Sequence, residues 1–546
     1  MKNILSFLIA FICSLTAVGQ TSAPYESPKL VVGIVVDQMR YDYITRYWER
    51  YREDGFKRMI REGFNARNHH FNYVPTYTGP GHTSVYTGTT PAVHGIIGND
   101  WYDKTIDKSV YCAGDDNVTP VGTQDAAGKM SPHRMKTTTV TDQLKLATQS
   151  RSKVIGIALK DRGAILPAGH TADAAYWFHG KNEGAWITSS YYMEELPKWV
   201  KDFNKAKSVS KYKKEWNTLY DIHTYVASGS DDNTFEGKFK GENAPVFPHN
   251  LPNLWKDNGS YDILKATPFG NSITTDFALA ALEGEQLGQG KTTDFLAISY
   301  SSPDYIGHSF GVNSIEVEDC YLRLDLELAR LFSALDSRVG KGNYTVFLTA
   351  DHGAVHVPAY LKSLNIPAGY FEKNEFVGRL KNFLKNKFNS DKLIKNVSNN
   401  QLFLDYDELA AINQSAKEVQ EAIAEEILNY DGIAEVYTAH SMKTQHYTEG
   451  MAYMLQKGFN HKRSGDVLVV LDASFISYSR TGSTHGSGFN YDTQVPFLMF
   501  GNGIKQGSTT RRTEIPDIAP TVAALLGIAY PNGTTGNPVG EALIEK

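Results

Sequence analysis

Cysteine is scarce in this sequence, with three among 546 residues: Cys13, Cys112 and Cys320. So few cysteines exclude a disulfide-rich scaffold, and a hydrophobic core has to stabilise the fold, with one disulfide at most. Positive charge is not in excess either, because 55 Lys and Arg face 60 Asp and Glu, for a net charge of −5. The sequence therefore predicts no general binding of nucleic acid polymers or of anionic membranes.

Long hydrophobic runs are missing as well. The apolar run nearest the N-terminus, Ile4–Cys13, follows Lys2 and precedes small residues at Ala17 and Gly19. It is shorter than the roughly 20 residues that span a bilayer. This order of charge, apolar run and small residues is typical of a cleavable signal peptide. We therefore expect residues 1–19 to be removed near Gly19 and the protein to be periplasmic or secreted.

Short β-rich apolar segments recur along the chain, and helical patterns lie between them. The apolar segments are Lys29–Val36, Lys153–Leu159, Asp294–Tyr300, Tyr344–Thr349, Val467–Leu471 and Val495–Phe500. Continuous apolar runs of this length are typical of strands buried on both faces of one sheet. Helical spacing of apolar residues appears at Tyr43–Glu62, Ser314–Ser337 and Asp517–Leu526. The repeated β-then-α order predicts an α/β fold with a central, mostly parallel sheet flanked by helices on both faces.

Two long segments interrupt this order within a single catalytic domain at residues 20–546. The first, at about 171–270, holds five of the seven tryptophans and lacks buried-strand runs, so we expect a cap beside the site. The second, at about 361–460, predicts a small α/β insertion. Its elements are two amphipathic helices and a short strand, at Glu375–Phe388, Ala416–Leu428 and Gln401–Leu404.

Carboxylate and imidazole side chains follow three of the predicted strands, and one more histidine lies in a loop of small residues, GSTHGSG. They are Asp37, Asp304, His308, Asp351, His352 and His485. In open α/β sheets, ligands gather at the carboxyl ends of the strands. Each residue alone is commonly a helix cap or turn former. Three Asp and three His together are the set expected of a dinuclear zinc centre with an open position on each ion. We expect His82, His94 and His356 to be structural.

A nucleophile is expected near such a centre, and the segment Val74–Gly88 (VPTYTGPGHTSVYTG) offers four hydroxyls. They belong to Thr76, Thr78, Thr83 and Ser84. The Gly-Pro-Gly turn leads into a helix, whose N-terminal N–H groups and dipole favour an anion. Spacing alone does not choose among the four hydroxyls. An ordinary Gly-Pro loop with a helix cap is the alternative interpretation.

Eight short motifs, in order, resemble those of the alkaline phosphatase superfamily, and most closely its PafA-type bacterial alkaline phosphatases. They are VVDQMR, TYTGPGHTSVYTG, HGIIGN, ALKDRG, SSPDYIGH, TADHG, GSTHGSG and DIAPTVAALLGI, and the match extends from about residue 29 to 540. The resemblance implies one zinc held by Asp304, His308 and His485, and a second held by Asp37, Asp351 and His352.

The same resemblance assigns roles to four further residues. Thr78 matches the nucleophile, Asn99 a contact to phosphate oxygen, and Lys160 and Arg162 the cationic pair of the monoesterase branch. The sequence shows no additional carboxylate set for a third, magnesium site, and the similarity implies that Lys160 supplies that positive charge.

The resemblance implies an exported alkaline phosphatase with two Zn²⁺ per chain. Its substrates would be small phosphate monoesters, cleaved through a phosphothreonine to release inorganic phosphate. A phosphodiesterase or nucleotide pyrophosphatase of the same superfamily is the nearest alternative, although it would lack the pair Lys160 and Arg162. A catalytically silent, zinc-stabilised binding protein that contacts a partner through the Trp-rich segment is another. The sequence leaves the oligomeric state open.

Overall fold

A ten-stranded sheet forms the centre of the computed structural model, which describes residues 26–181 and 184–545. The predicted signal peptide lies outside the described residues. In spatial order the strands are β19 (Gly507–Thr509), β2 (Phe64–Ala66), β18 (Phe497–Gly501), β11 (Tyr344–Thr349), β1 (Leu30–Val36), β10 (Asp294–Tyr300), β7 (Val154–Ala158), β8 (Ala174–His179), β9 (Ala185–Ser189) and β6 (Pro120–Val121). The five strands from β11 to β8 run parallel, whereas β18, β9 and β6 are antiparallel to a neighbour.

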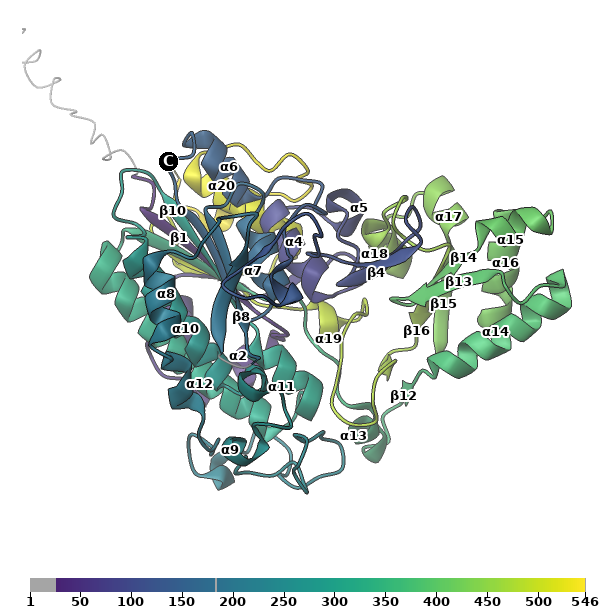
Figure 1. Cartoon of the computed structure of the whole chain (residues 1–546), viewed down its shortest axis with the longest axis horizontal. Coiled ribbons are helices and arrows are strands. Elements are labelled where there is room, and N and C mark those ends of the chain that lie inside the picture. The colour runs from purple at the N-terminus through teal and green to yellow at the C-terminus, as the bar shows by residue number, and fades with distance from the viewer. Residues whose placement is uncertain (1–25, 182–183, 546) are drawn as a thin grey trace, which may run out of the picture.

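Helices cover both faces of this sheet (Figure 1). On one face lie α4 (Thr78–Thr87), α6 (Val140–Ala147), α7 (Asp161–Ala168) and α20 (Ile518–Leu526), and on the other α8 (Lys198–Lys205), α10 (Phe269–Gly284) and α12 (Ile315–Leu335). Because strands between two helical layers are apolar on both sides, β1 is buried along its whole length. The predicted α/β fold with a mostly parallel sheet is confirmed.

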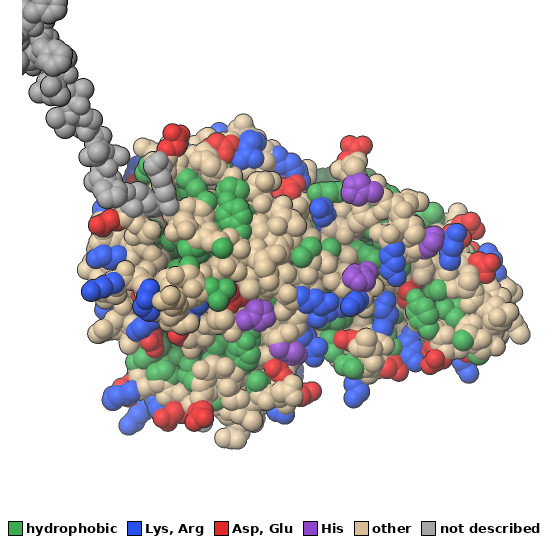
Figure 2. Space-filling view, turned by 90° about the horizontal axis from the view of Figure 1, so that it is seen from above, with side chains coloured by type: hydrophobic (Ala, Val, Ile, Leu, Met, Phe, Trp, Pro, Cys, Tyr) green, Lys and Arg blue, Asp and Glu red, His purple; other side chains and the backbone are tan. Residues whose placement is uncertain are grey.

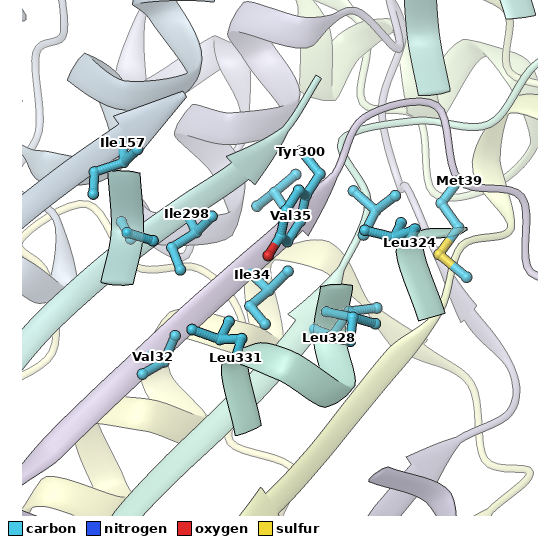
Figure 3. Packing of buried hydrophobic residues seen from close by; sticks show 14 of the residues in the cluster. Val32, Ile34, Val35, Met39, Ile157, Ile298, Tyr300, Leu324, Leu328 and Leu331 are labelled. Atoms are coloured by element: carbon cyan, nitrogen blue, oxygen red, sulfur yellow. The ribbon is translucent and has the colours of Figure 1, made fainter. Parts of the chain in front are cut away.

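Leucines spaced along α12 show how the sequence attaches this helix to the sheet. Leu324, Leu328 and Leu331 form one stripe, as their spacing of four and three residues requires. Leu328 and Leu331 lie near Val32 and Ile34 of β1, and Leu324 lies further along the stripe (Figure 3). All five side chains are fully buried. Burial of each leucine contributes about 1.5–3 kcal/mol to the free energy of unfolding.

Three predictions from the sequence are wrong in detail. The segment expected to lack buried strands contains β8 and β9, whose aromatic residues pack in the sheet. The pattern at Tyr43–Glu62 forms three pieces: α2 (Asp42–Arg46), a 3₁₀ turn (Trp48–Arg50) and α3 (Phe56–Glu62). The strand β16 (Val467–Leu471) does not return to the main sheet, because an apolar run indicates a buried strand but not its partner.

β16 belongs instead to a second sheet, in what we call the inserted unit, residues 373–471 (the green part of Figure 1). This sheet has the order β13 (Ile394–Ser398), β14 (Gln401–Leu404), β16 and β15 (Ile433–Thr438), and the unit also contains α14 (Lys373–Phe388), α15 (Tyr406–Ala411), α16 (Ala416–Ile427), α17 (Ala439–Thr444) and α18 (Gly450–Gly458). Side chains of α14, α16 and one face of the sheet form a hydrophobic cluster of their own.

The side chains that the sequence analysis left unassigned are mostly structural. Four of the five tryptophans in the first inserted segment, Trp177, Trp186, Trp216 and Trp255, are buried in the core. The thiols of Cys112 and Cys320 are buried and free.

In the part of the chain that the structure describes, none of the helices is long and apolar enough to cross a membrane.

Basic side chains gather where the inserted unit meets the core, although the net charge is negative (Figure 2). Arg463 lies at this junction. Its guanidinium donates to the carbonyl oxygens of Gly95 and, at 2.9 Å, of Arg134. Burial and the nearby Arg134 lower the pKa of Arg463 to about 10. The contact between core and unit is therefore polar and hydrogen-bonded at this point.

Candidate active site

Three aspartates converge because β10, β1 and β11 are neighbours in the sheet. Asp37 directly follows β1, Asp351 directly follows β11, and Asp304 lies in the first turn of α11 (Ser302–Phe310), just after β10. Their exposed fractions are 0%, 0% and 3%. Isolated carboxylates are rarely buried to this extent without a partner. The structure thus brings together the three strand-end carboxylates that the sequence singled out.

The predicted histidines lie around these carboxylates. Two groups have ligand atoms within 4.8 Å of one another: Asp37, Asp351 and His352, and Asp304, His352 and His485. His352 belongs to both groups. Its ring stacks on the ring of His485, with centroids 3.4 Å apart. Nε2 of His308 lies 3.1 Å from Oδ1 of Asp304. All six predicted ligands are therefore in one cluster.

The hydrogen bonds of the three histidines fit a metal centre. Each ring donates its Nδ1–H to a backbone carbonyl: His308 to Ser483 at 2.8 Å, His485 to Thr76 at 2.7 Å, and His352 to Gly353 at 3.0 Å. Such a bond orients the ring and leaves Nε2 as the ligand atom, as in metal-binding histidines generally.

Two carboxylate oxygens of the cluster point to the same conclusion. Oδ1 of Asp37 and Oδ2 of Asp351 are buried and have no hydrogen-bond partner among the described residues. Burial and the neighbouring Asp351 raise the pKa of Asp37 well above its ordinary value. Burial acts in the same direction on Asp304, but His308 and Lys160 outweigh it and lower its pKa. The donor set of buried Asp oxygens and His nitrogens fits divalent cations such as Zn²⁺.

Lys160 connects two of the three carboxylates. It precedes α7, is 5% exposed, and its Nζ lies 2.7 Å from Oδ2 of Asp37 and 2.5 Å from Oδ2 of Asp304. Burial lowers the pKa of Lys160, but the two carboxylates more than compensate and raise it. Arg162 follows in the first turn of α7, and its Nη1 donates to the hydroxyl of Tyr111 at 3.1 Å. Of the predicted cationic pair, Lys160 is therefore in direct contact with the cluster, and Arg162 follows it at the start of the same helix.

The geometry distinguishes the four candidate hydroxyls. Thr78 is the first residue of α4, and its Oγ1 lies 3.5 Å from Nε2 of His352. The other three are engaged elsewhere: Thr76 donates to the Ser487 carbonyl at 2.9 Å, Thr83 to the Gly79 carbonyl at 2.7 Å, and Ser84 lies 3.0 Å from Nε2 of His94. Of the four hydroxyls, that of Thr78 is the one that lies beside the side chain of a predicted metal ligand.

The turn that presents Thr78 is held by close contacts. Oδ1 of Asn99 accepts the N–H of Gly79 at 2.7 Å, so Asn99 lies directly beside Thr78. A Cβ at Gly81 would lie 2.2 Å from the carbonyl oxygen of Asp351. Glycine is therefore required there, because the helix start approaches the backbone of a predicted ligand.

Two supporting residues were not among the predicted site residues. Gln38 donates its backbone N–H to Asp351 at 3.1 Å and its side-chain amide to Asp304 at 2.7 Å, which connects the two groups. His82, expected to be structural, lies 2.9 Å from the Thr78 carbonyl and 3.2 Å from Oδ2 of Asp351. Gln38 lies in the motif VVDQMR and His82 in TYTGPGHTS, and this is the sequence signal that could have identified them as site residues.

Comparisons with known proteins support the predicted family. Residues 31–494 match the family of type I phosphodiesterases and nucleotide pyrophosphatases. A Myroides odoratus protein described as a calcium-transporting ATPase is 48% identical over 98% of each chain. Alkaline phosphatase PafA of Elizabethkingia meningoseptica is 44% identical over 94% of each chain. A crystal structure of wild-type PafA has a TM-score of 0.92 at 43% identity, covering 96% of this chain and 100% of its own.

These matches extend over nearly the whole chain and include the segments that hold the clustered Asp and His residues. The prediction of the family from eight short motifs is confirmed. The chain belongs to the alkaline phosphatase superfamily, among the PafA-type bacterial alkaline phosphatases, and is a phosphatase.

Proposed function

We propose that this enzyme hydrolyses phosphate monoesters to an alcohol and inorganic phosphate, with Thr78 as the nucleophile. The observation that carries the proposal is the position of the Thr78 hydroxyl. It lies at the start of α4 and beside His352, where three buried aspartates and three histidines converge. The related alkaline phosphatases support the same reaction class.

The cluster fits two divalent cations, because it holds unpartnered buried carboxylate oxygens and rings with Nε2 turned inward. Two zinc ions would be held by Asp304, His308 and His485 and by Asp37, Asp351 and His352, and would supply positive charge that favours an ionised hydroxyl and an anionic leaving oxygen.

Two displacements at phosphorus follow from the position of Thr78. The Thr78 hydroxyl gives its proton to solvent and Oγ1 forms a bond to phosphorus while the bond to the ester oxygen breaks, and the departing alkoxide takes a proton from water. A water then attacks the phosphothreonine and gives up a proton, the bond to Oγ1 breaks, Oγ1 takes up a proton, and inorganic phosphate leaves. Because Thr78 begins the ten-residue helix α4, the partial positive charge of the helix N-terminus favours the phosphoryl group there.

Charge favours monoesters over diesters in this proposal. A monoester dianion carries one negative charge more than a diester, the buried Lys160 contacts the cluster, and the half-buried Arg162 follows it in the first turn of α7. Arg162 can hold two phosphoryl oxygens at once, and Asn99 contacts a third from beside Thr78. A phosphodiesterase is the alternative, and the description of the matched family includes that activity. Its substrate has one negative charge fewer, so it does not need both Lys160 and Arg162.

The test is kcat/KM for p-nitrophenyl phosphate and methyl p-nitrophenyl phosphate on protein of measured zinc content, since both share one leaving group. We expect about two zinc ions per chain and a strong preference for the monoester. A preference for the diester would establish the phosphodiesterase instead. Bound zinc without turnover of either ester would identify the silent binding protein.

We also propose that the protein is exported, with cleavage near Gly19, on the basis of its N-terminal pattern. N-terminal sequencing of protein recovered from the periplasm and the medium tests this. A mature chain that retains residues 1–19 in the cytoplasm would contradict export.

A further inference from the structure

A cavity of about 120 Å³ adjoins the candidate active site, between the core and the inserted unit. From the core it is bordered by Tyr77 and by the loop that carries His485. From the inserted unit and the segment after it, the lining includes Asn400, Val469, Leu471 and Phe475. A second cavity, of about 200 Å³, shares Tyr77, Asn400, Val469 and Ser477 with the first. We call the two together the side cleft.

The side cleft begins within one residue of the proposed nucleophile. Tyr77 precedes Thr78, and its ring meets the ring of His485 edge to face with centroids 5.7 Å apart. A Cβ at Gly486 would lie 2.4 Å from the Tyr77 ring. The aromatic wall is therefore held in place by close packing on a predicted metal-ligand loop.

The opposite wall is also fixed relative to the site. The turn between β13 and β14, Asn399–Asn400, has positive φ at both residues, as a two-residue hairpin requires. Asn399 donates its side-chain amide to the carbonyl of Asp100 at 2.7 Å, next to Asn99. A phosphoryl group held between Thr78 and Asn99 therefore lies close to both walls of the cleft.

The lining selects the kind of group that fits. Val469, Leu471 and Phe475 are apolar, and Asn400 and Ser477 add polar contacts, the usual mixture of a small-molecule site. Among the described residues that line the first cavity there is no Lys or Arg, and Asp472 and Asp492 lie there. Lys373 borders the second cavity, so a second anionic group is disfavoured in the first cavity, next to the site. A cavity of about 150 Å³ accommodates a benzene ring. The two cavities of the side cleft, of about 120 and 200 Å³, together therefore have room for one ring and a further group.

We propose that the side cleft binds the organic part of the phosphate monoester, and that it favours an uncharged, ring-bearing group such as a nucleoside over a small alkyl group. This inference rests on the proposed monoesterase function. It assigns the inserted unit a role in substrate selection, while the core carries the phosphoryl chemistry.

The test compares adenosine 5′-monophosphate with glycerol 3-phosphate, because both release a primary alcohol. Ser477→Trp fills the cleft from an exposed position that borders both cavities. Ser479→Trp is the matched control, since Ser479 is exposed two residues further on and borders neither cavity. Asn400→Gly removes a polar contact but retains the positive φ. Inhibition by inorganic phosphate reports on the phosphoryl site alone.

We expect the wild-type enzyme to favour the nucleotide. Ser477→Trp should lower the ratio of the two kcat/KM values at least tenfold, Asn400→Gly severalfold, and Ser479→Trp less than twofold, with inhibition by phosphate unchanged. An unchanged ratio in both Ser477→Trp and Asn400→Gly would overturn the inference, as would an equal loss on both substrates with weakened phosphate inhibition. Failure of the wild type to hydrolyse either ester would instead overturn the proposed function.

Discussion

The core and the inserted unit bury different kinds of side chain. Between the ends of β10, β1 and β11 the core buries Asp37, Asp351 and Lys160, which a fold does not need and which are costly to remove from water. The inserted unit packs apolar residues such as Leu380 and Ile423, while charged pairs such as Lys417 with Glu421 stay exposed. The difference teaches that carboxylates, histidines and a lysine converging at neighbouring strand ends mark the reactive region, since other buried carboxylates of the core, such as Asp319, bond to structural partners such as Trp216. Apolar burial marks the scaffold.

Removal of metal is the strongest test of the distinction between the reactive region and the scaffold. We expect chelation to abolish turnover and added zinc to restore it, because Asp37 and Asp351 otherwise remain as buried like charges. Thermal unfolding followed alongside activity should show a lower Tm in the chelated protein. Full activity in protein shown to be free of metal would contradict the assignment.

Thr78→Ala should lower kcat/KM for a monoester by many orders of magnitude, whereas Thr78→Ser should retain substantial activity. Thr76→Ala and Thr83→Ala are the matched controls, because their hydroxyls donate to backbone carbonyls. Steady-state kinetics on protein of equal zinc content measures all four variants. If kcat/KM of Thr78→Ala stays within tenfold of wild type while Thr76→Ala or Thr83→Ala is inactive, another hydroxyl is the nucleophile.

Arg162→Ala should lower monoester kcat/KM by two to three decades and diester kcat/KM by much less. A charge pair about 4 Å apart at an effective dielectric near 20 interacts by roughly 4 kcal/mol, and each factor of ten corresponds to about 1.4 kcal/mol. Lys160→Ala should reduce both activities, since it also leaves Asp37 and Asp304 without their cation. Equal losses on both substrates for Arg162→Ala would show that it supports the site without discriminating.

Two leucine substitutions compare the scaffolds directly. Leu380→Ala in the inserted unit and Leu328→Ala in the core both remove fully buried side chains, and each should lower the free energy of unfolding by about 2–5 kcal/mol. We expect kcat/KM for glycerol 3-phosphate to stay within about twofold for Leu380→Ala. Denaturant unfolding and kinetics at 25 °C measure both effects. Loss of turnover with a folded Leu380→Ala protein would tie the unit to the phosphoryl chemistry.

His249 sharpens the comparison, because it is a buried charge outside the reactive region. Burial lowers its pKa, but hydrogen bonds to Glu242 and Glu316 prevail and raise it to about 9. The folded protein holds this proton more tightly than the unfolded chain. The stabilisation is therefore complete below about pH 6.5 and is lost as the pH rises through about 9.

The measurement is the Tm difference between wild type and His249→Gln from pH 6 to 10, which should narrow as the pH rises. Glu236, whose pKa burial and Glu316 raise to about 10, is present in both proteins. A difference that stays constant with pH would show that His249 acts only through packing.

Much of the site could be predicted because its residues lie next to recognisable local structure. Asp37 and Asp351 immediately follow buried strands, and the helical spacing of Asp304 and His308 places them on one side of α11. The choice of Thr78 among four hydroxyls could not be derived from spacing. It depends on hydrogen-bond partners such as the Ser487 carbonyl, which is 411 positions from Thr76.

Two errors on strands have different causes. The apolar pattern of β16 is a genuine strand pattern, but it carries no information on which strand lies beside it. The strand β8 was missed, because its aromatic residues were interpreted as part of a cap. Gln38 shows the same limit as β16 at the site. Its two acceptors, Asp304 and Asp351, are 266 and 313 positions away, so its bridging role exists only once β10, β1 and β11 are side by side.

The sequence by itself determined the family, the α/β order of elements and the candidate metal ligands, because these depend on local patterns and on side-chain chemistry at strand ends. The tertiary structure alone decided which hydroxyl stands beside His352, that Lys160 joins Asp37 to Asp304, and that the inserted unit forms one wall of a cleft beside Tyr77. The physical reason is that each of these contacts joins segments far apart in the chain, whose approach is set by the packing of two sheets.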